Sequence, residues 1–461
     1  MARLAHLEGR PFVNVVLRGL RVIDPLAGVD ERRRDVWISD GRIAGISAEI
    51  DEPEAEVVDL TPPDGAAPHV LCPAFVDLHA HLREPGNEEA ETIDSGARAA
   101  AAGGFGTVVA MANTQPVRDT AQRVGEARAL ARGAVVRVLP AAALTKGADG
   151  RALVDLAGCA AAGAVAFSDD GRNAVTPDLL TKALRAAAPL GRPILIHSED
   201  ERLVEKANPG FSSLSRCPSR PHAAETRAVV VALQALEAAG CGRIHLQHLS
   251  VGASVELVRR ARQRGLAVTA EVTPHHLALS LPVEAEPDPH ALIKVNPPLR
   301  GERDRLALVG AVRDGSIDAI ATDHAPHRDA DKAGDYEHAL PGMIGLETAL
   351  AACLTLGELG GAALPATVAR LTAGPHRVLG RDSGLPEPRL EVGELATCTL
   401  FDPGAEWVVG EEPFQSRSRN TPLLGQRLRG KVLLTMVEGR VAHHDEARLP
   451  LALPLAGAVR V

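Results

Sequence analysis

The sequence predicts an α/β fold: a (β/α)8 TIM-like barrel with a small composite β domain formed by the N- and C-terminal segments. In the middle of the chain, short apolar runs alternate with helical stretches rich in Ala, Leu and Arg, which is typical of repeated βα units. Both ends instead carry short β-rich runs broken by turn residues. A doubly wound sheet is the main alternative, but no strand is followed by a G-x-G-x-x-G turn.

The repeated units can be followed in order along the chain. Eight candidate strands lie at 70–79, 106–111, 135–142, 164–167, 193–197, 243–247, 267–272 and 317–322. Helical segments between them include 90–102, 155–162, 223–239, 254–264 and 303–313. Eight βα units over this length fit a barrel with insertions, because ~250 residues are typical and over 400 occur.

The β-rich ends are too small to bury separate cores. The first covers 15–60, with a turn expected at Asp40-Gly41, and similar texture returns at 395–401 and 431–441. The simplest solution is that both ends share one domain. We therefore predict a composite β domain from 1–72 plus 385–461, and a barrel over 73–384.

Composition excludes several classes of protein. With 45% hydrophobic and 24% charged residues, wholesale disorder is excluded. The net charge of −9, from 50 basic and 59 acidic residues, argues against nucleic-acid binding. No uncharged apolar stretch of ~18 residues indicates a membrane span, and residues 1–10 lack the apolar core of a signal peptide. We therefore expect a cytoplasmic protein without a membrane partner.

Imidazoles and carboxylates follow five of the eight predicted strands. His79 and His81 are two residues apart, so both side chains point to one face of the strand. Each group alone has an ordinary explanation as a surface residue or turn, but barrel active sites lie at this rim. Neutral imidazole and carboxylate suit zinc and similar ions, and two ions need about six such groups with one bridging carboxylate. The groups at these strand ends are His79 and His81, Asp169 and Asp170, His197 with Glu199 and Asp200, His248, and Asp323 with His324 and His327.

Strand periodicity narrows this set without completing it. Asp169 and Asp170 are neighbours that face opposite ways, so periodicity leaves the choice between them open. His245 is three residues from His248, which places it on the opposite face, buried outside the site. His275, His276 and His324 are candidates for structural or supporting roles.

Several motifs resemble those of a known family. The string FVDLHAHLREPG at 75–86 resembles the metal motif of dihydroorotases, within the amidohydrolase superfamily, and ATDHAPH at 321–327 resembles their second signature. Between these, ANT, FSDDG, TPHH and NPPLR follow in the family's order, at 112–114, 167–171, 273–276 and 296–300. The resemblance is closest to the bacterial type I branch, whose bridging ligand is an aspartate.

The resemblance implies a ligand set for two zinc ions. One ion would be held by His79, His81 and Asp323, the other by His197 and His248, with Asp170 as the bridge. It also implies the activity, which is reversible hydrolysis of (S)-dihydroorotate to N-carbamoyl-L-aspartate in de novo pyrimidine (UMP) biosynthesis. Asp323 would take a proton from the attacking water and give it to the departing ring nitrogen.

The resemblance also implies substrate-binding residues. The planar fork of Arg83, two residues beyond His81, suits a carboxylate. Further matching positions are Asn113 and His327 for the carboxylate, and Asn296, Pro341 and Gly342 for the ring. The polar stretch 328–339 is either a mobile lid or a plain surface loop. Two small departures from the family pattern are Ala112, where proline is usual, and a variant loop at 340–343.

Two alternatives remain open at this point. A dihydropyrimidinase, hydantoinase or allantoinase of the same superfamily would bridge its metals with a carboxylated lysine, but 164–168 contains no lysine. A non-catalytic dihydroorotase-like scaffold for aspartate transcarbamoylase would lack metal ligands, and all six expected ligands are present. The expected partner is a small-molecule substrate. The sequence is compatible with a homo-oligomer and with a complex with aspartate transcarbamoylase.

Overall fold

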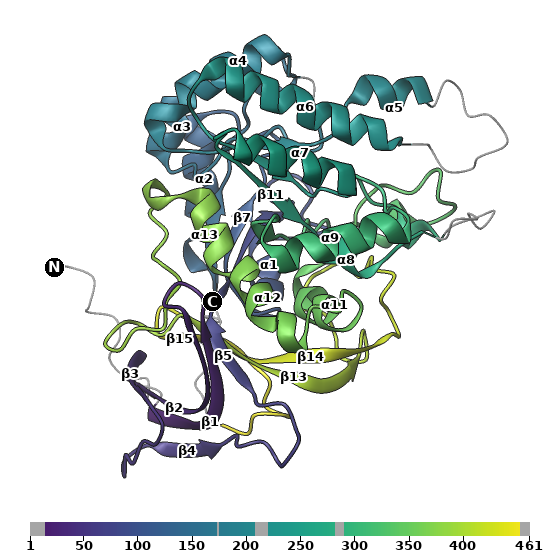
Figure 1. Cartoon of the computed structure of the whole chain (residues 1–461). Helices are drawn as coiled ribbons and strands as arrows, with labels where there is room; N and C mark the ends of the chain where they lie inside the picture. The colour runs from purple at the N-terminus through teal and green to yellow at the C-terminus, as the bar shows by residue number, and fades with distance from the viewer. Residues whose placement is uncertain (1–13, 173–174, 208–219, 282–289, 452–461) are drawn as a thin grey trace.

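The computed structural model describes residues 14–172, 175–207, 220–281 and 290–451, and shows a mixed α/β fold. Strands from both ends of the chain lie together at one end of the molecule, and helices surround parallel strands at the other (Figure 1). Residues 1–10, where the sequence lacks the apolar core of a signal peptide, lie outside the described residues. Within the described residues, no helix has the length and apolar character needed to cross a membrane.

In the described residues, an eight-stranded sheet joins the two ends of the chain in the order β15-β14-β13-β5-β1-β2-β3, and β4 pairs with β1. Its central contact is the antiparallel pair of β5 and β13, with Leu71 opposite Leu400. One apolar cluster spans both ends of the chain and includes Leu17 and Leu434. The strands are β1 Asn14–Asp24, β2 Val29–Ser39, β3 Arg42–Ser47, β4 Glu56–Asp59, β5 Val70–Pro73, β13 Cys398–Val408, β14 Arg427–Val437 and β15 Arg440–His444.

The turn expected at Asp40-Gly41 is confirmed. It joins β2 to β3, with Ser39 paired to Arg42, and both turn residues have positive φ, 51° and 70°. Two-residue hairpins favour this geometry because its twist matches that of the strands, and Asp-Gly adopts it readily.

A second group of strands is parallel and lies at the centre of the helices. The order is β6-β7-β8 in one set and β9-β10-β11-β12 in the other. Parallel bridges of Phe167 to Ala142 and to Ile194 connect the two sets, and a bridge of Ala80 to His324 connects their other edges. The pairings therefore close on themselves. The strands are β6 Phe75–Ala80, β7 Phe105–Ala110, β8 Arg137–Pro140, β9 Ile194–His197, β10 Ile244–Gln247, β11 Val268–Val272 and β12 Ala319–Ile320.

Three predicted strands differ clearly from the structure, and one of them, 317–322, is shortened to β12. The predicted strand 70–79 is divided at Ala74, whose N–H donates to the carbonyl of Thr397 in the terminal segment, whereas the next N–H, of Phe75, donates to Gly104. The chain thus changes sheets at this residue. The predicted strand 164–167 is reduced to the bridges at Phe167.

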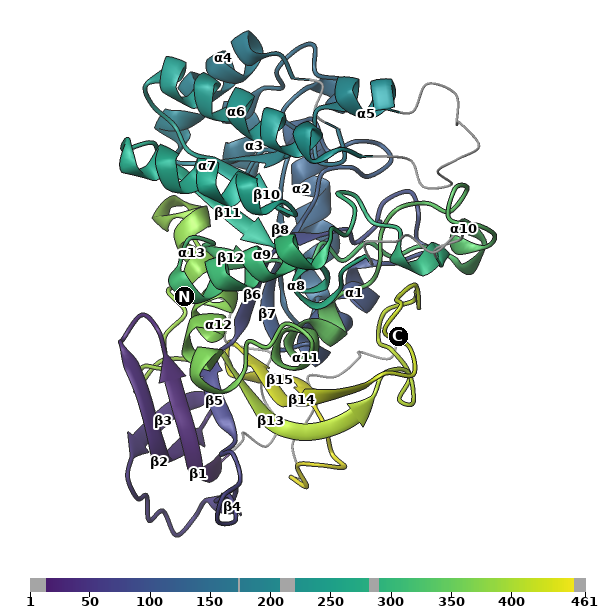
Figure 2. The ribbon, with the colours of Figure 1, turned by 45° about the vertical axis from the view of Figure 1, so that its right-hand side comes forward.

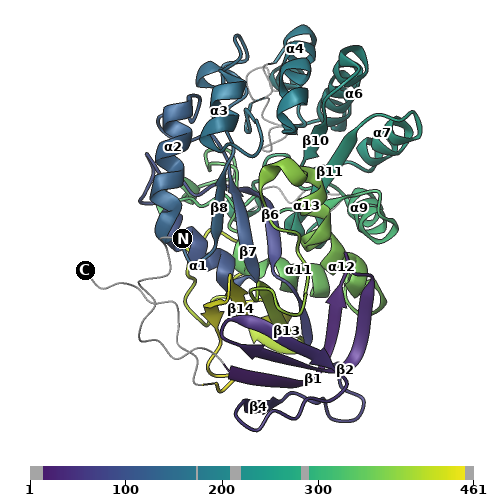
Figure 3. The ribbon, with the colours of Figure 1, turned by 90° about the vertical axis from the view of Figure 1, so that its left-hand side faces the viewer.

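The helices lie outside the parallel strands, and Figure 3 shows α2, α3, α4, α6, α7 and α9 as an outer arc around them. The predicted helices correspond to α1, α3, α6, α7 and α9. The helices are α1 Ile93–Ala102, α2 Ala121–Leu130, α3 Leu156–Ala162, α4 Pro177–Ala187, α5 Glu201–Ala207, α6 His222–Ala239, α7 Gly252–Gln263, α8 Pro274–Ala278, α9 Glu302–Asp314, α10 Asp329–Lys332, α11 Ala349–Thr355, α12 Leu364–Leu371 and α13 Ala373–Leu379. Short 3-10 turns are η1 Ala131–Gly133, η2 Lys146–Ala148, η3 Ala188–Leu190, η4 Ala291–Ile293, η5 Leu346–Thr348, η6 Gly361–Ala363 and η7 Arg381–Ser383.

Candidate active site

The six expected metal ligands converge at the carboxyl ends of the parallel strands. They come from the end of β6, the segment after Phe167, the end of β9, and the residues that follow β10 and β12. All six are buried. Two overlapping groups, one of His79, His81 and Asp170 and one of Asp170, His197 and His248, each have ligand atoms within 4.8 Å of one another.

Asp170 lies at the centre of this cluster. Its Oδ1 is 3.3 Å from Nε2 of His79, 3.6 Å from Nδ1 of His197 and 3.8 Å from Nε2 of His248. Its Oδ2 is 3.4 Å from Nε2 of His81. One carboxylate therefore faces both histidine groups, as a bridging ligand must.

Asp323 and Asp169 have contrasting surroundings. Oδ1 of Asp323 is 3.0 Å from Nε2 of His81 and 3.5 Å from Nε2 of His79, so Asp323 completes the first histidine group. Asp169 points elsewhere, and its Oδ1 accepts the N–H groups of Leu144 and Thr145 at 2.8 and 3.0 Å. Asp169 and its neighbour Asp170 thus face different parts of the molecule.

The residues of the cluster fit a metal ion. Oδ1 of Asp170 and Nδ1 of His248 are buried and have no hydrogen-bond partner among the described residues. Such atoms are costly to bury without compensation. Imidazole nitrogens and carboxylate oxygens are the ligands that zinc and similar divalent cations accept. A bound cation would account for Oδ1 of Asp170; the nitrogen of His248 that faces Asp170 is Nε2, not the unpartnered Nδ1.

The charges of the cluster reinforce one another. Burial disfavours the imidazolium form of His79, but Asp170 and Asp323 outweigh burial and hold its pKa well above the usual value. Against the same burial, Asp170 and Glu199 raise the pKa of His197 to about 9. Burial would raise the pKa of Asp170, yet the imidazoles hold it well below its usual value. The site thus favours positive charge, which protons or a cation can supply.

Glu271 on β11 supports the cluster and was missed by the sequence analysis. Its Oε1 is 2.9 Å from Nδ1 of His79, and its Oε2 is 2.9 Å from Nε2 of His245. Although burial opposes ionisation, the two histidines lower the pKa of Glu271 to about 2. Carboxylates in this position fix the orientation and tautomer of ligating histidines. A single glutamate within the apolar strand 268–272 was the available signal.

The backbone is strained at three residues of the site. Arg83, His248 and Asp323 have positive φ values of 57°, 36° and 47°. Such conformations cost about 1–3 kcal/mol for a residue with a side chain, and they cluster at functional sites. Asp77 helps to hold this region, because it accepts the N–H groups of His79 and Thr322 at 3.2 and 2.8 Å.

The residues predicted to bind the substrate's carboxylate lie beside the cluster. Oδ1 of Asn113 is 3.0 Å from Nδ1 of His81. Nε of Arg83 donates to the carbonyl of Pro326 at 3.1 Å. Nε2 of His327 is 2.9 Å from the carbonyl of Pro341, and its Nδ1 is buried without a partner among the described residues. The carboxylate candidates therefore contact either a cluster ligand or the segment that follows Asp323.

Asn296 lies at the other side of the cluster, where its Nδ2 is 3.4 Å from Nε2 of His197. Arg220, which the sequence analysis did not identify, donates to Oδ1 of Asn296 at 2.7 Å and also to Glu199. Glu199 in turn lies 3.7 Å from His197. This ion pair links a predicted ring-binding residue to a cluster ligand.

The segment 328–339 begins with α10 and is anchored by Lys332. This buried side chain donates to the carbonyls of Leu340 and Gly342 at 2.8 and 3.0 Å. Movement of the segment as a lid stays a prediction.

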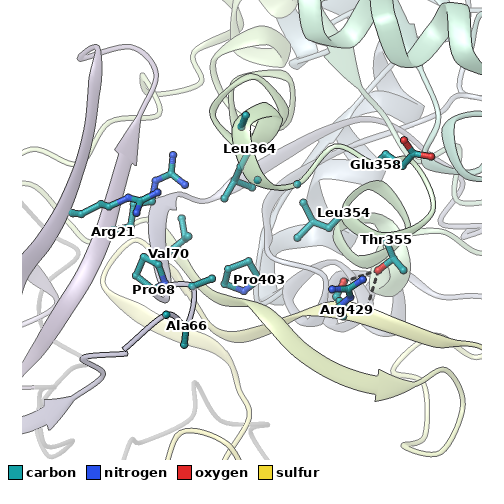
Figure 4. A pocket seen from close by; sticks show the side chains of 16 residues that line it. Arg21, Ala66, Pro68, Val70, Leu354, Thr355, Glu358, Leu364, Pro403 and Arg429 are labelled. Atoms are coloured by element: carbon teal, nitrogen blue, oxygen red, sulfur yellow. Dashed lines mark hydrogen bonds between the residues drawn. The ribbon is translucent and has the colours of Figure 1, made fainter. Parts of the chain in front are cut away.

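A cavity of about 830 Å³ lies elsewhere, between the terminal sheet and the helices α11 and α12 (Figure 4). Its lining includes Arg21, Val70, Leu354, Leu364 and Arg429, and none of its lining residues belongs to the histidine cluster. Cavity size alone therefore does not locate the site, whereas the chemistry of the side chains does.

Comparison with known proteins agrees with these observations. Residues 68–253 match a family model described as Dihydro-orotase-like. A dihydroorotase of Anaeromyxobacter dehalogenans (strain 2CP-C) is 42% identical, covering 93% of this chain and 98% of the relative. A dihydroorotase of Aquifex aeolicus is 38% identical, covering 94% of this chain and 100% of the relative.

Solved structures show the same fold. An L-hydantoinase (dihydropyrimidinase) from Arthrobacter aurescens has a TM-score of 0.80 at 25% identity, with 94% of this chain and 96% of that chain covered. A dihydropyrimidinase from Brevibacillus agri has a TM-score of 0.79 at 21% identity and the same coverage. Because the sequence identity to the curated relatives extends over nearly the full length of both chains, this chain belongs to the dihydroorotase family.

Proposed function

We propose that this protein is a zinc-dependent dihydroorotase, which hydrolyses (S)-dihydroorotate reversibly to N-carbamoyl-L-aspartate. The main support is the convergence of four histidines around Asp170 at 3.3–3.8 Å, with Asp323 beside two of them. The curated relatives named dihydroorotase match nearly the whole chain. Opening a cyclic amide requires an activated water and a polarised carbonyl, and a metal centre can provide both.

We also propose that the closed series of parallel strands, β6 to β12 with Phe167, is a (β/α)8 barrel comprising 73–384. The residues 1–72 plus 385–461 would form the composite β domain, of which 1–13 and 452–461 lie outside the described residues. The eight-stranded sheet that joins β5 to β13 supports this division. The site then lies at the carboxyl ends of the strands, where barrel enzymes carry their catalytic residues.

In this proposal, His79, His81 and Asp323 would hold one zinc ion, His197 and His248 would hold the other, and Asp170 would be shared. When bound, the ions would lower the pKa of water to ~7 and polarise the scissile carbonyl. Glu271 and Asn113 orient the imidazoles from behind, since they contact Nδ1 of His79 and Nδ1 of His81.

Asp323 is proposed as the proton carrier. Burial would raise its pKa, but the neighbouring His79 and His81 lower it well below its usual value, so the carboxylate is ionised at neutral pH. An ionised carboxylate beside the reacting atoms can accept a proton from water and pass it to the leaving ring nitrogen.

The substrate's carboxylate is proposed to bind at Arg83, Asn113 and His327, and its ring at Asn296, Pro341 and Gly342. Burial, followed by the charge of Arg83, lowers the pKa of His327 to about 4, so its imidazole is neutral near pH 7. The guanidinium of Arg83 therefore supplies the charge in this group.

A cyclic-amide hydrolase of the hydantoinase type is the second candidate, because solved structures of that type share the fold. They differ from this chain in the group that bridges the two metal ions, because a carboxylated lysine is expected to be the bridge in enzymes of that type. Lys146 and Lys182 are exposed on η2 and α4, and Asp170 occupies the central position. A non-catalytic scaffold is disfavoured because the ligand set is complete.

The test combines metal stoichiometry with turnover of dihydroorotate, N-carbamoyl-L-aspartate, hydantoin and allantoin across pH. We expect about two zinc ions per chain. We also expect kcat/KM for dihydroorotate to be at least ~100-fold above those for the uncarboxylated amides, because such amides leave the carboxylate-binding side chains unpaired. Faster hydrolysis of hydantoin or allantoin would favour the second candidate. Less than one metal equivalent and no turnover after zinc addition would favour the scaffold.

A further inference from the structure

The segment between β13 and β14 extends from the terminal sheet to the substrate side of the site. Figure 2 shows this yellow loop rising from the sheet on the side of α10. Its residues contact loops that are more than 300 positions away in the sequence, for example through the Ser418 hydroxyl, which donates to the carbonyl of Ala90 at 2.8 Å. The C-terminal part of the chain thus lies against the loops that carry the site.

Asn420 makes the densest set of contacts in this segment. Its Oδ1 accepts the N–H of His327 at 3.0 Å, and its Nδ2 donates to the carbonyls of Ala325 and Gly342 at 3.0 and 3.1 Å. Its own carbonyl accepts the N–H of Ile344 at 3.1 Å. The residue is 3% exposed. One side-chain amide therefore ties the segment 325–327 to the segment 342–344.

The two segments are packed so closely that their relative position is sensitive to displacement. Gly342 has φ +134°, and a Cβ added there would lie 2.7 Å from Cβ of Ala325 and 2.9 Å from Nε2 of His327. The imidazole of His327 also contacts the carbonyl of Pro341 at 2.9 Å. A shift of either segment moves the imidazole, and misplacement by ~1 Å is enough to impair a reaction markedly.

We propose that Asn420 is a positioning residue for substrate binding, which fixes the position of His327 relative to Pro341 and Gly342. This inference rests on the proposed function, because that function places the substrate's carboxylate and ring at these residues. Asn420 itself need not touch the substrate. An amide is required because the same side chain accepts one N–H and donates to two carbonyls, which neither a carboxylate nor an alkyl group can do.

The test compares Asn420→Asp and Asn420→Ala with the control Ser418→Ala. Ser418 is buried in the same segment, but its side chain bonds to Ala90 and not to His327 or Gly342. Each variant is assayed as the metal-loaded, full-length protein, together with its zinc content and melting temperature. We expect KM for dihydroorotate to rise about 10-fold or more in both Asn420 variants, since they leave buried groups unsatisfied. Zinc content should stay unchanged, and kcat should change less than KM.

Ser418→Ala should leave KM within about 2-fold of wild type, even where it lowers the melting temperature as much as the Asn420 variants do. A normal KM in folded, zinc-loaded Asn420→Ala would overturn the proposal. So would KM values that follow the melting temperature across all three variants. If Asn420→Asp does not fold, Asn420→Ala, which adds no charge, provides the test.

A substrate-free measurement separates this inference from the proposed function. Wild-type protein without turnover of dihydroorotate would refute the proposed function alone. The imidazole NMR signals of His327 report on Asn420 in either case. They should shift in both Asn420 variants and stay in place in Ser418→Ala, and unshifted signals in the Asn420 variants would refute the positioning role.

Discussion

The histidine cluster around Asp170 and the residues proposed to bind the substrate, here called the rim, lie side by side, but different kinds of contact hold them. The cluster ligands end or closely follow parallel strands, and buried side chains such as Glu271 support their imidazoles. The rim residues His327 and Gly342 are in loops, and Asn420 and Lys332 hold them through backbone atoms. A strand largely fixes the direction of the side chains at its end, whereas a loop needs contacts from distant segments to fix its position. Variants of the cluster should therefore affect chemistry and metal binding, and variants of the rim should affect KM.

The largest expected effect separates chemistry from folding. Asp323→Ala should lower kcat by at least ~10³-fold, because it removes the proposed proton carrier. The protein should stay folded, as judged by circular dichroism, because Asp170 still faces His79 and His81. The exposed Asp329 on α10 provides a control, and Asp329→Ala should retain full activity. Near-normal turnover of Asp323→Ala would exclude its proposed role.

A second variant tests the support behind the cluster. Glu271→Gln should weaken zinc binding about 10- to 100-fold, because the glutamate fixes His79 and this kind of partner typically contributes that much. Competition with a chelator measures the affinity. Thr269→Val is the matched control, since Thr269 contacts only the far nitrogen, Nδ1, of His245 in this network. Equal losses of affinity in both variants would show that Glu271 has no special role.

The smallest of the three effects concerns the rim. Arg83→Met should raise KM for dihydroorotate about 10-fold through loss of a charge-assisted bond, with zinc content unchanged. Hydrolysis of an amide without a carboxylate, such as dihydrouracil, should be affected much less. If zinc is lost instead, Arg83 belongs to the support of the cluster, and the distinction between the two regions is wrong at this residue.

The same contrast explains what the sequence could predict. Alternation along a strand was enough to place His79 and His81 on one face. It could not separate Asp169 from Asp170, because that difference depends on which partners each aspartate meets: the N–H groups of residues 144 and 145, or four imidazoles. Asn420 was missed because its role depends on loops about 80 to 95 positions away, which no local pattern encodes.

For the fold, too, local patterns were predictable and contacts between distant segments were not. The order of most strands and of five helices could be predicted from apolar periodicity, which reflects burial within each element. The division of 70–79 could not, because it depends on Ala74 meeting Thr397 from the other end of the chain. The predicted strand 164–167 has its bridges at Phe167, and the backbones of Val165 and Ala166 also bond to Pro140 and Ala142.

The left-handed backbone at Arg83, His248 and Asp323 sets a limit on how heat-resistant this enzyme can become while it remains active. Glycine at any of these positions would release local strain of about 1–3 kcal/mol, but would delete a side chain proposed to bind a metal ion or the substrate's carboxylate. Directed evolution for thermostability should therefore find its useful substitutions in the terminal sheet and the outer helices, and harmful ones here.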